Sequence, residues 1–146
     1  MSSVHETALR LLARREHSAY ELMQKLKQRG FENEAIHAEV LRCQHLGLQS
    51  DTRFAESLCR ARIRQGYGPR RIQQALQAAQ VDMTVIDAVL MSDPEQWIVH
   101  AREVWLKKYK IIEAESYALL QKQKQFLFYR GFSSETITMM LREHDN

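Results

Sequence analysis

The sequence predicts an all-α protein made of three tandem three-helix repeats. Its 146 residues include only 5 glycines and 2 prolines, and the segments between them are rich in Ala, Leu, Gln, Glu, Lys and Arg, which favour helix. Apolar residues recur at helical spacing, as at Ile72, Ala75, Leu76 and Ala79, and no segment alternates with the period of two that is typical of a strand. An apolar pattern also recurs along the chain, which is the sequence signature of a repeat protein.

The recurring pattern is a leucine, a large apolar residue five positions later, an isoleucine after five more, and another apolar residue one turn further on. The copies are offset by 50 and then 51 residues, and their positions are Leu26, Phe31, Ile36 and Val40; Leu76, Val81, Ile86 and Leu90; Leu127, Phe132, Ile137 and Leu141. The pattern predicts a helix that ends soon after the leucine, a corner filled by the second apolar residue, and a helix that begins at once.

The corners themselves differ between the copies. Gly30 and Gly131 stand where a helix commonly ends in a left-handed residue, a conformation that costs glycine least. The middle copy has Gln80 at this position, so we expect its turn to be made differently or with slight strain.

The helix that precedes each corner has its own start signal. Ser18 followed by Glu21 is a capping-box pattern. In the middle copy Gly68 aligns with Ser18, and Pro69 fits the first helical position, where its missing N–H loses nothing. The third copy is looser, with a helix near 97–108 and a few extra residues before the helix that carries Phe126.

These signals predict repeats at residues 1–49, 50–92 and 93–146. A single unit of this size has a marginal core, and stacking lets neighbouring units cover each other's apolar faces. We therefore expect an elongated, curved array, and we expect the chain to be a monomer.

Composition excludes several classes of protein. No apolar run is long enough to cross a membrane, and the N-terminus lacks the apolar stretch of a secretory signal. We therefore expect a cytoplasmic protein in which Cys43 and Cys59 are reduced thiols. The net charge of +3 does not by itself identify a nucleic-acid-binding protein.

No motif indicates catalysis or a cofactor. The GYG of residues 66–68 lacks the preceding strand and the third glycine of a dinucleotide fingerprint. His37, Cys43 and His45 would make a poor zinc site, because no second ligand pair accompanies them. We expect no enzyme activity, no cofactor and no metal. The aromatic residues Trp97, Trp105, Phe126, Phe128 and Tyr129 are interpreted as core of the third repeat.

Basic residues cluster on the middle repeat. Arg53, Arg60 and Arg64 fall within roughly 40° of one another on a helix near 51–65, at 100° per residue, and Arg70 and Arg71 begin the next helix. Cations in a first helical turn oppose the helix dipole, which suggests a role other than local stability. The cluster is either a solvated helix flank or a surface for an anionic partner, and we favour the latter. Lys107 and Lys108 form a second cluster.

Three stretches of the chain, Arg15–Leu22, Ser50–Leu76 and Arg130–Phe132, resemble the bacterial RecX regulatory proteins. Arg15, Ser18, Glu21 and Leu22 are similar to the family's opening R-x-x-S-x-x-E-L motif. SDTRFAESLCRARIRQGYGPRRIQQAL resembles its most distinctive stretch, and Arg130, Gly131 and Phe132 resemble its R-G-F closing motif. The departures are Gln80 and the divergent stretch 111–121.

The resemblance implies a non-enzymatic modulator of the RecA recombinase with tandem three-helix repeats. Such proteins bind the RecA filament on single-stranded DNA, lie along its groove, and inhibit ATP hydrolysis and strand exchange. We expect the partner to contact the basic residues of this chain, with Arg60, Arg64, Arg70 and Arg71 as the first choice and Lys107 and Lys108 as the second. Arg53, on the same helix flank as Arg60 and Arg64, is also an expected contact. The alternative is a helical module that binds single-stranded or duplex DNA and acts without RecA.

Overall fold

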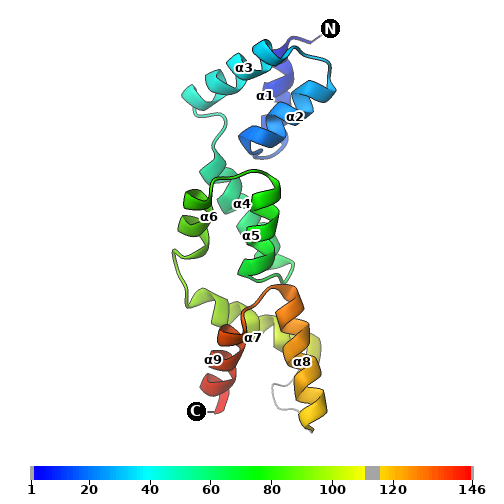
Figure 1. Cartoon of the computed structure of the whole chain (residues 1–146), viewed down its shortest axis with the longest axis vertical. Coiled ribbons are helices and arrows are strands. Elements are labelled where there is room, and N and C mark those ends of the chain that lie inside the picture. The colour runs from blue at the N-terminus through cyan, green and yellow to red at the C-terminus, as the bar shows by residue number, and fades with distance from the viewer. Residues whose placement is uncertain (1, 111–115, 146) are drawn as a thin grey trace. The chain divides into compact units, whose positions relative to one another are not determined.

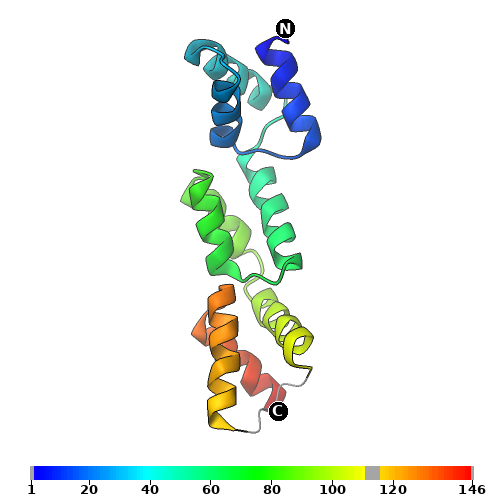
Figure 2. The same cartoon turned by 90° about the vertical axis from the view of Figure 1, so that its right-hand side faces the viewer.

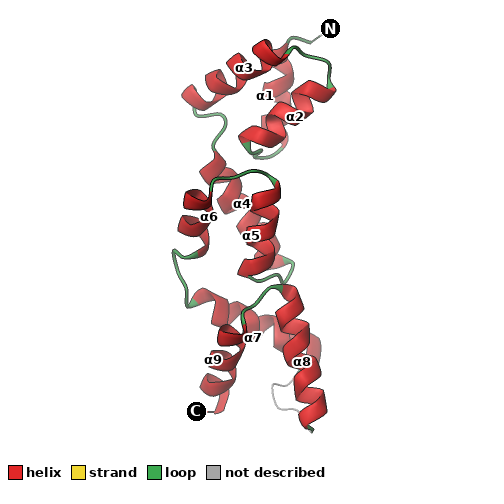
Figure 3. Cartoon of the chain, viewed as in Figure 1, coloured by secondary structure: helices red, strands yellow, loops and turns green. Residues whose placement is uncertain are grey.

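The computed structural model describes residues 2–110 and 116–145, and within these residues the chain forms nine α-helices and no strand (Figures 1 and 3). The all-α prediction is confirmed. The helices are α1 (Val4–Arg14), α2 (Ala19–Gln28), α3 (Asn33–His45), α4 (Asp51–Arg64), α5 (Pro69–Ala78), α6 (Met83–Leu90), α7 (Gln96–Tyr109), α8 (Tyr117–Arg130) and α9 (Ser134–Asp145).

The chain divides into two compact units. The first unit comprises Met1–Leu58 and Leu76–Val89, and the second comprises Cys59–Ala75 and Leu90–Asn146. The division falls inside α4 and α5, so each of these helices contributes residues to both units. Residues 111–115, part of the stretch that departs from the RecX pattern, lie outside the described residues.

The first unit has its core among α1, α2 and α3, which contact one another, as the views of Figures 1 and 2 agree. The core forms because each helix carries apolar residues at three- and four-residue spacing on its inner face. These fully or almost fully buried residues are Ala8, Leu11, Leu22, Leu26, Ile36, Val40 and Cys43.

In the second unit α7 packs against both α8 and α9, which also contact each other. Trp97 and Trp105 are buried on α7, as predicted. The indole Nε1–H of Trp97 donates a hydrogen bond of 3.0 Å to the carbonyl of Leu90, so the buried ring keeps a partner for its polar atom.

The recurring apolar positions are core positions in all three copies. Ten of the twelve are buried, and Phe31 and Leu141 are partly buried. Gly30 and Gly131 are left-handed, with φ of 89° and 105°, as predicted. Gln80 adopts φ of 56°, so the middle copy makes the same turn without glycine, at a cost of about 1–2 kcal/mol.

The predicted helix starts are also confirmed. Ser18 Oγ accepts a hydrogen bond from the Glu21 backbone N–H, and the Glu21 side chain accepts one from the Ser18 N–H, which completes the capping box. Pro69 is the first residue of α5. Ser18 and Pro69 therefore mark the starts of α2 and α5.

Candidate functional site

The C-terminus of α8 meets the N-terminus of α5 inside the second unit. The N–H of Gly68 donates to the carbonyl of Arg130 at 2.8 Å, and the N–H of Arg70 donates to the carbonyl of Gly131 at 3.0 Å. The first N–H groups of one helix and the last carbonyls of the other lack partners within their own helices. The hydrogen bonds between α5 and α8 give partners to N–H groups of one helix and carbonyls of the other. They also place the positive end of the α5 dipole beside the negative end of the α8 dipole.

This corner needs glycine because two backbones approach closely. A Cβ atom on Gly68 would lie 2.6 Å from the carbonyl carbon and oxygen of Gly131, and one on Gly131 would lie 2.7 Å from Cγ of Arg71. The stretch GPRR and the closing R-G-F segment therefore form the two halves of one contact.

The first unit holds a corresponding contact between its own corners. Ser18, which aligns with Gly68, donates from Oγ to the carbonyl of Ala79 at 2.9 Å. Ala79 aligns with Arg130, so the helix-to-helix corner is itself a repeated feature.

Two arginine side chains reinforce the corner in the second unit. Nε of Arg71 donates to the carbonyl of Tyr129 at 2.8 Å, and Nη1 of Arg130 donates to the carbonyl of Gln65 at 3.1 Å. Both carbonyls lie at a helix end, where a cation is favourable. Arg71 thus opposes the dipole of α5 but stabilises the end of α8, so its place in a first helical turn has a structural cause.

Cations and rings alternate across the same surface, in an arrangement that we call the cation–π ladder. Lys108 Nζ and Arg130 Cζ lie 5.1 and 5.2 Å from the ring centroid of Phe126. Arg130 and Arg71 lie 5.2 and 5.9 Å from that of Tyr67. The ladder therefore runs Lys108, Phe126, Arg130, Tyr67, Arg71, and each contact falls within the range of favourable cation–π attraction.

A basic groove of about 500 Å³ lies beside the ladder. Its lining contributes four cations and one carboxylate, and these charged residues are Arg64, Lys107, Lys108, Arg130 and Glu103. Among the described residues, no carboxylate lies within 4.0 Å of any of the four cationic groups. Within the part of the chain that the structure describes, the groove thus carries a net positive charge that ion pairs do not neutralise.

The other predicted contact residues fall in different places. Arg70 lies with Cζ 5.5 Å from the ring centroid of Phe128 and lines a smaller hollow of about 270 Å³ with Arg71. Arg60 is exposed on the part of α4 that belongs to the second unit. The structure thus brings Arg64 together with the two lysines of α7, and places Arg70 beside Arg71.

Arg53 belongs to the first unit and is engaged within it. Its Nε donates to Glu16 at 2.9 Å, and its Nη2 donates to the carbonyl of Gly47 at 2.8 Å. Because these bonds tie two loops to α4, Arg53 has a structural role. No hydrogen bond or ion pair of this kind joins the side chain of Arg60 or Arg64 to another described residue.

The interpretation of the α8 aromatics as core is wrong for two of the three. Phe128 is 40% exposed and Tyr129 is 59% exposed, whereas Phe126 is partly buried. Three aromatics within four residues cannot share one face at 100° per residue. That spacing was the signal from which an exposed ring could have been predicted.

Arg130 was noted only as part of the closing motif, and no sequence signal placed it in the groove.

Neither cysteine has the character of a nucleophile or metal ligand. Burial raises the pKa of the Cys43 thiol to about 11, helped by its hydrogen bond to Glu39. Burial also raises the pKa of Cys59, which Arg60 opposes. Within the described residues no group of three or more His, Cys, Asp or Glu could hold a metal ion.

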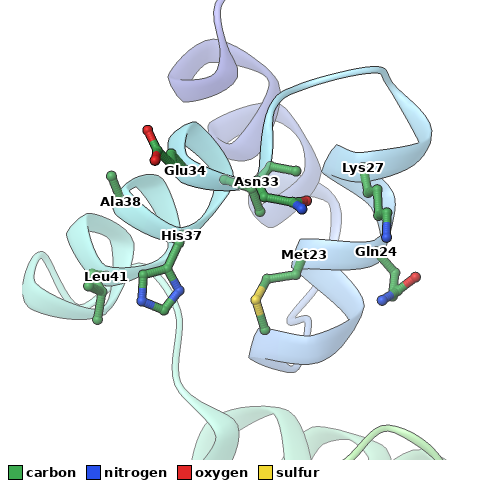
Figure 4. Close-up of a pocket in the computed structure, with 9 residues that line it drawn as sticks. Met23, Gln24, Lys27, Asn33, Glu34, His37, Ala38 and Leu41 are labelled. Atoms are coloured by element: carbon green, nitrogen blue, oxygen red, sulfur yellow. The ribbon is translucent and has the colours of Figure 1, made fainter.

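Another hollow, of about 690 Å³, lies between α2 and α3 of the first unit (Figure 4). Met23, Ile36 and Leu41 make much of its lining apolar, and its charged residues, Lys27 and Glu34, are balanced. It therefore shows no preference for an anionic partner, unlike the groove of the second unit.

Known proteins match the chain over its whole repeat region. Residues 5–43, 50–90 and 95–141 match the first, second and third three-helix domains of RecX. A protein of Legionella pneumophila named "Regulatory protein RecX" is 44% identical over 143 residues, which is 98% of this chain and 95% of the relative. The chain belongs to the RecX family. The prediction of three three-helix repeats is thereby confirmed.

Other RecX proteins give the same result. Relatives of the same name from Pseudomonas entomophila and Vibrio vulnificus are 39% and 37% identical, each over 98% of this chain and 92% and 94% of the relative. The crystal structure of RecX from Lactobacillus salivarius matches with a TM-score of 0.83 at 23% identity, covering 97% of this chain and 94% of that one. RecX proteins are regulatory proteins, and no helix among the described residues of this member is long and apolar enough to span a membrane.

Proposed function

We propose that this RecX protein binds the RecA filament on single-stranded DNA and inhibits its ATP hydrolysis and strand exchange. It acts by binding alone, without catalytic chemistry or a cofactor. The observation that carries the proposal is the basic surface of the second unit, where Arg64, Lys107 and Lys108 have no carboxylate partner among the described residues. A surface of this kind favours an anionic or polyanionic partner.

Inhibition requires more than affinity. A ligand shifts an equilibrium between filament states only if it binds one state better than another. In an elongated, curved array, as the sequence predicts, three repeats would contact neighbouring RecA protomers and resist the changes that accompany ATP turnover. Arg60, Arg64, Arg70, Arg71, Lys107 and Lys108 are the proposed contacts; Arg53, with its partners in the first unit, contributes least.

The test is the double variant R60A/R64A in an assay of DNA-dependent ATP hydrolysis by the cognate RecA. Among the described residues neither side chain makes a hydrogen bond or an ion pair, so helicity and thermal unfolding should stay close to those of the wild type while inhibition weakens strongly. The matched control is R29A/R42A, which removes two exposed arginines from the first repeat and changes the net charge equally. A folded R60A/R64A variant with undiminished inhibition would remove this surface from the mechanism.

The alternative, a helical DNA-binding module that acts without RecA, makes a different prediction. A module that acts through DNA alone should inhibit DNA-dependent ATP hydrolysis by an unrelated DNA-dependent ATPase as well as by RecA. Inhibition confined to RecA excludes this alternative.

A further inference from the structure

Exposed aromatic rings lie beside cations on one helix of the second unit. Phe128 and Tyr129 are 40% and 59% exposed, and Arg70 stacks on the face of Phe128. Large aromatic side chains normally contribute to a core or an interface, and these two leave much of their area in solvent. They are therefore available to a partner.

These rings are connected to the basic groove through Arg71. Both line a hollow with Arg70 and Arg71, and Arg71 is the last member of the cation–π ladder that leads to the groove. Phe128 also lines a hollow of about 610 Å³ between α8 and α9, whose charged lining residues are Lys122 and Lys124 and include no acid.

We infer that the basic groove and these two rings together bind single-stranded nucleic acid directly, with phosphates in the groove and unpaired bases stacked on Phe128 and Tyr129. The inference rests on the proposed function, because it names the component of the filament that this surface contacts. One chemical feature, the exposed aromatic rings, favours a nucleic acid over an acidic protein segment. Cations alone would suit either partner, but exposed rings beside those cations match the π-faces of bases.

The surface also favours a single strand over a duplex. Bases in a duplex are stacked on each other and present only their edges, so they cannot cover an aromatic ring. Phosphates of either form would suit Arg64, Lys107 and Lys108. The aromatic pair therefore supplies the preference, and the groove supplies affinity that depends on salt.

The test measures binding of a fluorescent oligothymidylate to the full chain by anisotropy, without RecA, for the wild type and F128A/Y129A. The expected result is a loss of at least about fivefold in affinity, the lower end of the effect of losing one base–aromatic stack. The matched control is Y117A, which removes an aromatic that is 78% exposed on the same helix and belongs to neither the groove nor the ladder. It should bind like the wild type.

A second variant, K107A/K108A, keeps the inference testable should F128A/Y129A fold poorly. It should lower the salt dependence of binding, by roughly 0.7 in the log–log slope for each lost phosphate contact. A duplex of equal length should bind more weakly than the single strand, and oligoglutamate of equal charge should compete poorly.

Three results would overturn the inference: equal binding by F128A/Y129A and the wild type, an unchanged salt slope in K107A/K108A, or equal competition by oligoglutamate. The last would show that the surface takes an acidic protein segment. Inhibition of RecA by the same variants separates the two proposals. If F128A/Y129A binds DNA normally and still inhibits, only the inference of base stacking fails. If the wild type binds DNA but never inhibits RecA, the proposed function fails.

Discussion

Replacing Gly68 by alanine tests the corner between α5 and α8. The added Cβ would lie 2.6–2.7 Å from three backbone atoms of Gly131 and Phe132, which cannot move aside as a flexible side chain could. The two backbones must separate, and the hydrogen bonds from Gly68 and Arg70 are lost or lengthened. At about 0.5–1.5 kcal/mol for each net hydrogen bond, the second unit should lose about 1–3 kcal/mol.

The size of the effect distinguishes this account from a simpler one. Gly68 is not in the left-handed region, and its carbonyl accepts the first hydrogen bond of α5, from the N–H of Ile72. If Gly68 served only as this helix boundary, alanine would lose up to about 1 kcal/mol because it is a poorer cap, and it would regain about 0.4–1 kcal/mol because it restricts the unfolded chain. The net change would then be close to zero, whereas the corner contact predicts a loss of about 1–3 kcal/mol.

Native-state hydrogen exchange locates the change. The amides of residues 68 and 70 should exchange roughly 5- to 150-fold faster in G68A, the equivalent of about 1–3 kcal/mol. The control is G30A, where the added Cβ meets nothing within 4 Å and only the left-handed backbone at φ of 89° is strained. It should destabilise the first unit and leave those two amides unchanged. Unchanged or slower exchange in G68A would refute the corner contact.

Two further predictions concern the first unit. Q80G should raise the free energy of unfolding by about 0.5–1 kcal/mol, since glycine relieves the left-handed strain at φ of 56° but adds freedom to the unfolded chain; a lower melting temperature would contradict this. Burial lowers the pKa of His17 below its ordinary value of 6.5, although the hydrogen bond to the Arg15 carbonyl opposes the shift. The folded state therefore takes up this proton less readily than the unfolded state, so stability should fall as pH decreases below about 6.5, by at most about 1.4 kcal/mol per pH unit. Urea titrations of H17N across this range should lack that component, and parallel pH profiles for H17N and the wild type would rule it out.

Local signals in the sequence were enough to predict the fold. Helix starts at Ser18 and Pro69, and the left-handed turns at Gly30 and Gly131, depend on a few neighbouring residues, and all are confirmed. Gln80 was recognised as the exceptional corner because the repeats could be compared position by position. The three repeats of one chain thus supplied the position-by-position comparison that identified Gln80.

The site was harder to predict because it depends on contacts between distant segments. Gly68 and Arg130 are 62 positions apart and share a hydrogen bond that no local pattern reveals. Arg71 was assigned to a partner because it opposes the dipole of its own helix, whereas the carbonyl that it stabilises belongs to α8. Helical spacing placed Arg53 with Arg60 and Arg64, but it could not show that Glu16 engages Arg53.

The aromatic residues illustrate the same limit. Aromatic side chains are usually expected in the core, and Trp97 and Trp105 are buried there. Phe128 and Tyr129 do not, because α8 turns them away from the face that packs and places Phe128 beside Arg70. Only the three-dimensional arrangement shows that rings and cations share one surface.

The most direct test of the central claim is DNA-dependent ATP hydrolysis by the cognate RecA, titrated with this protein at two salt concentrations. A basic surface that binds the filament predicts inhibition that saturates with protein and weakens at the higher salt, because counterions screen exposed charges. No inhibition at any protein concentration, or inhibition that is the same at both salt concentrations, would contradict the account.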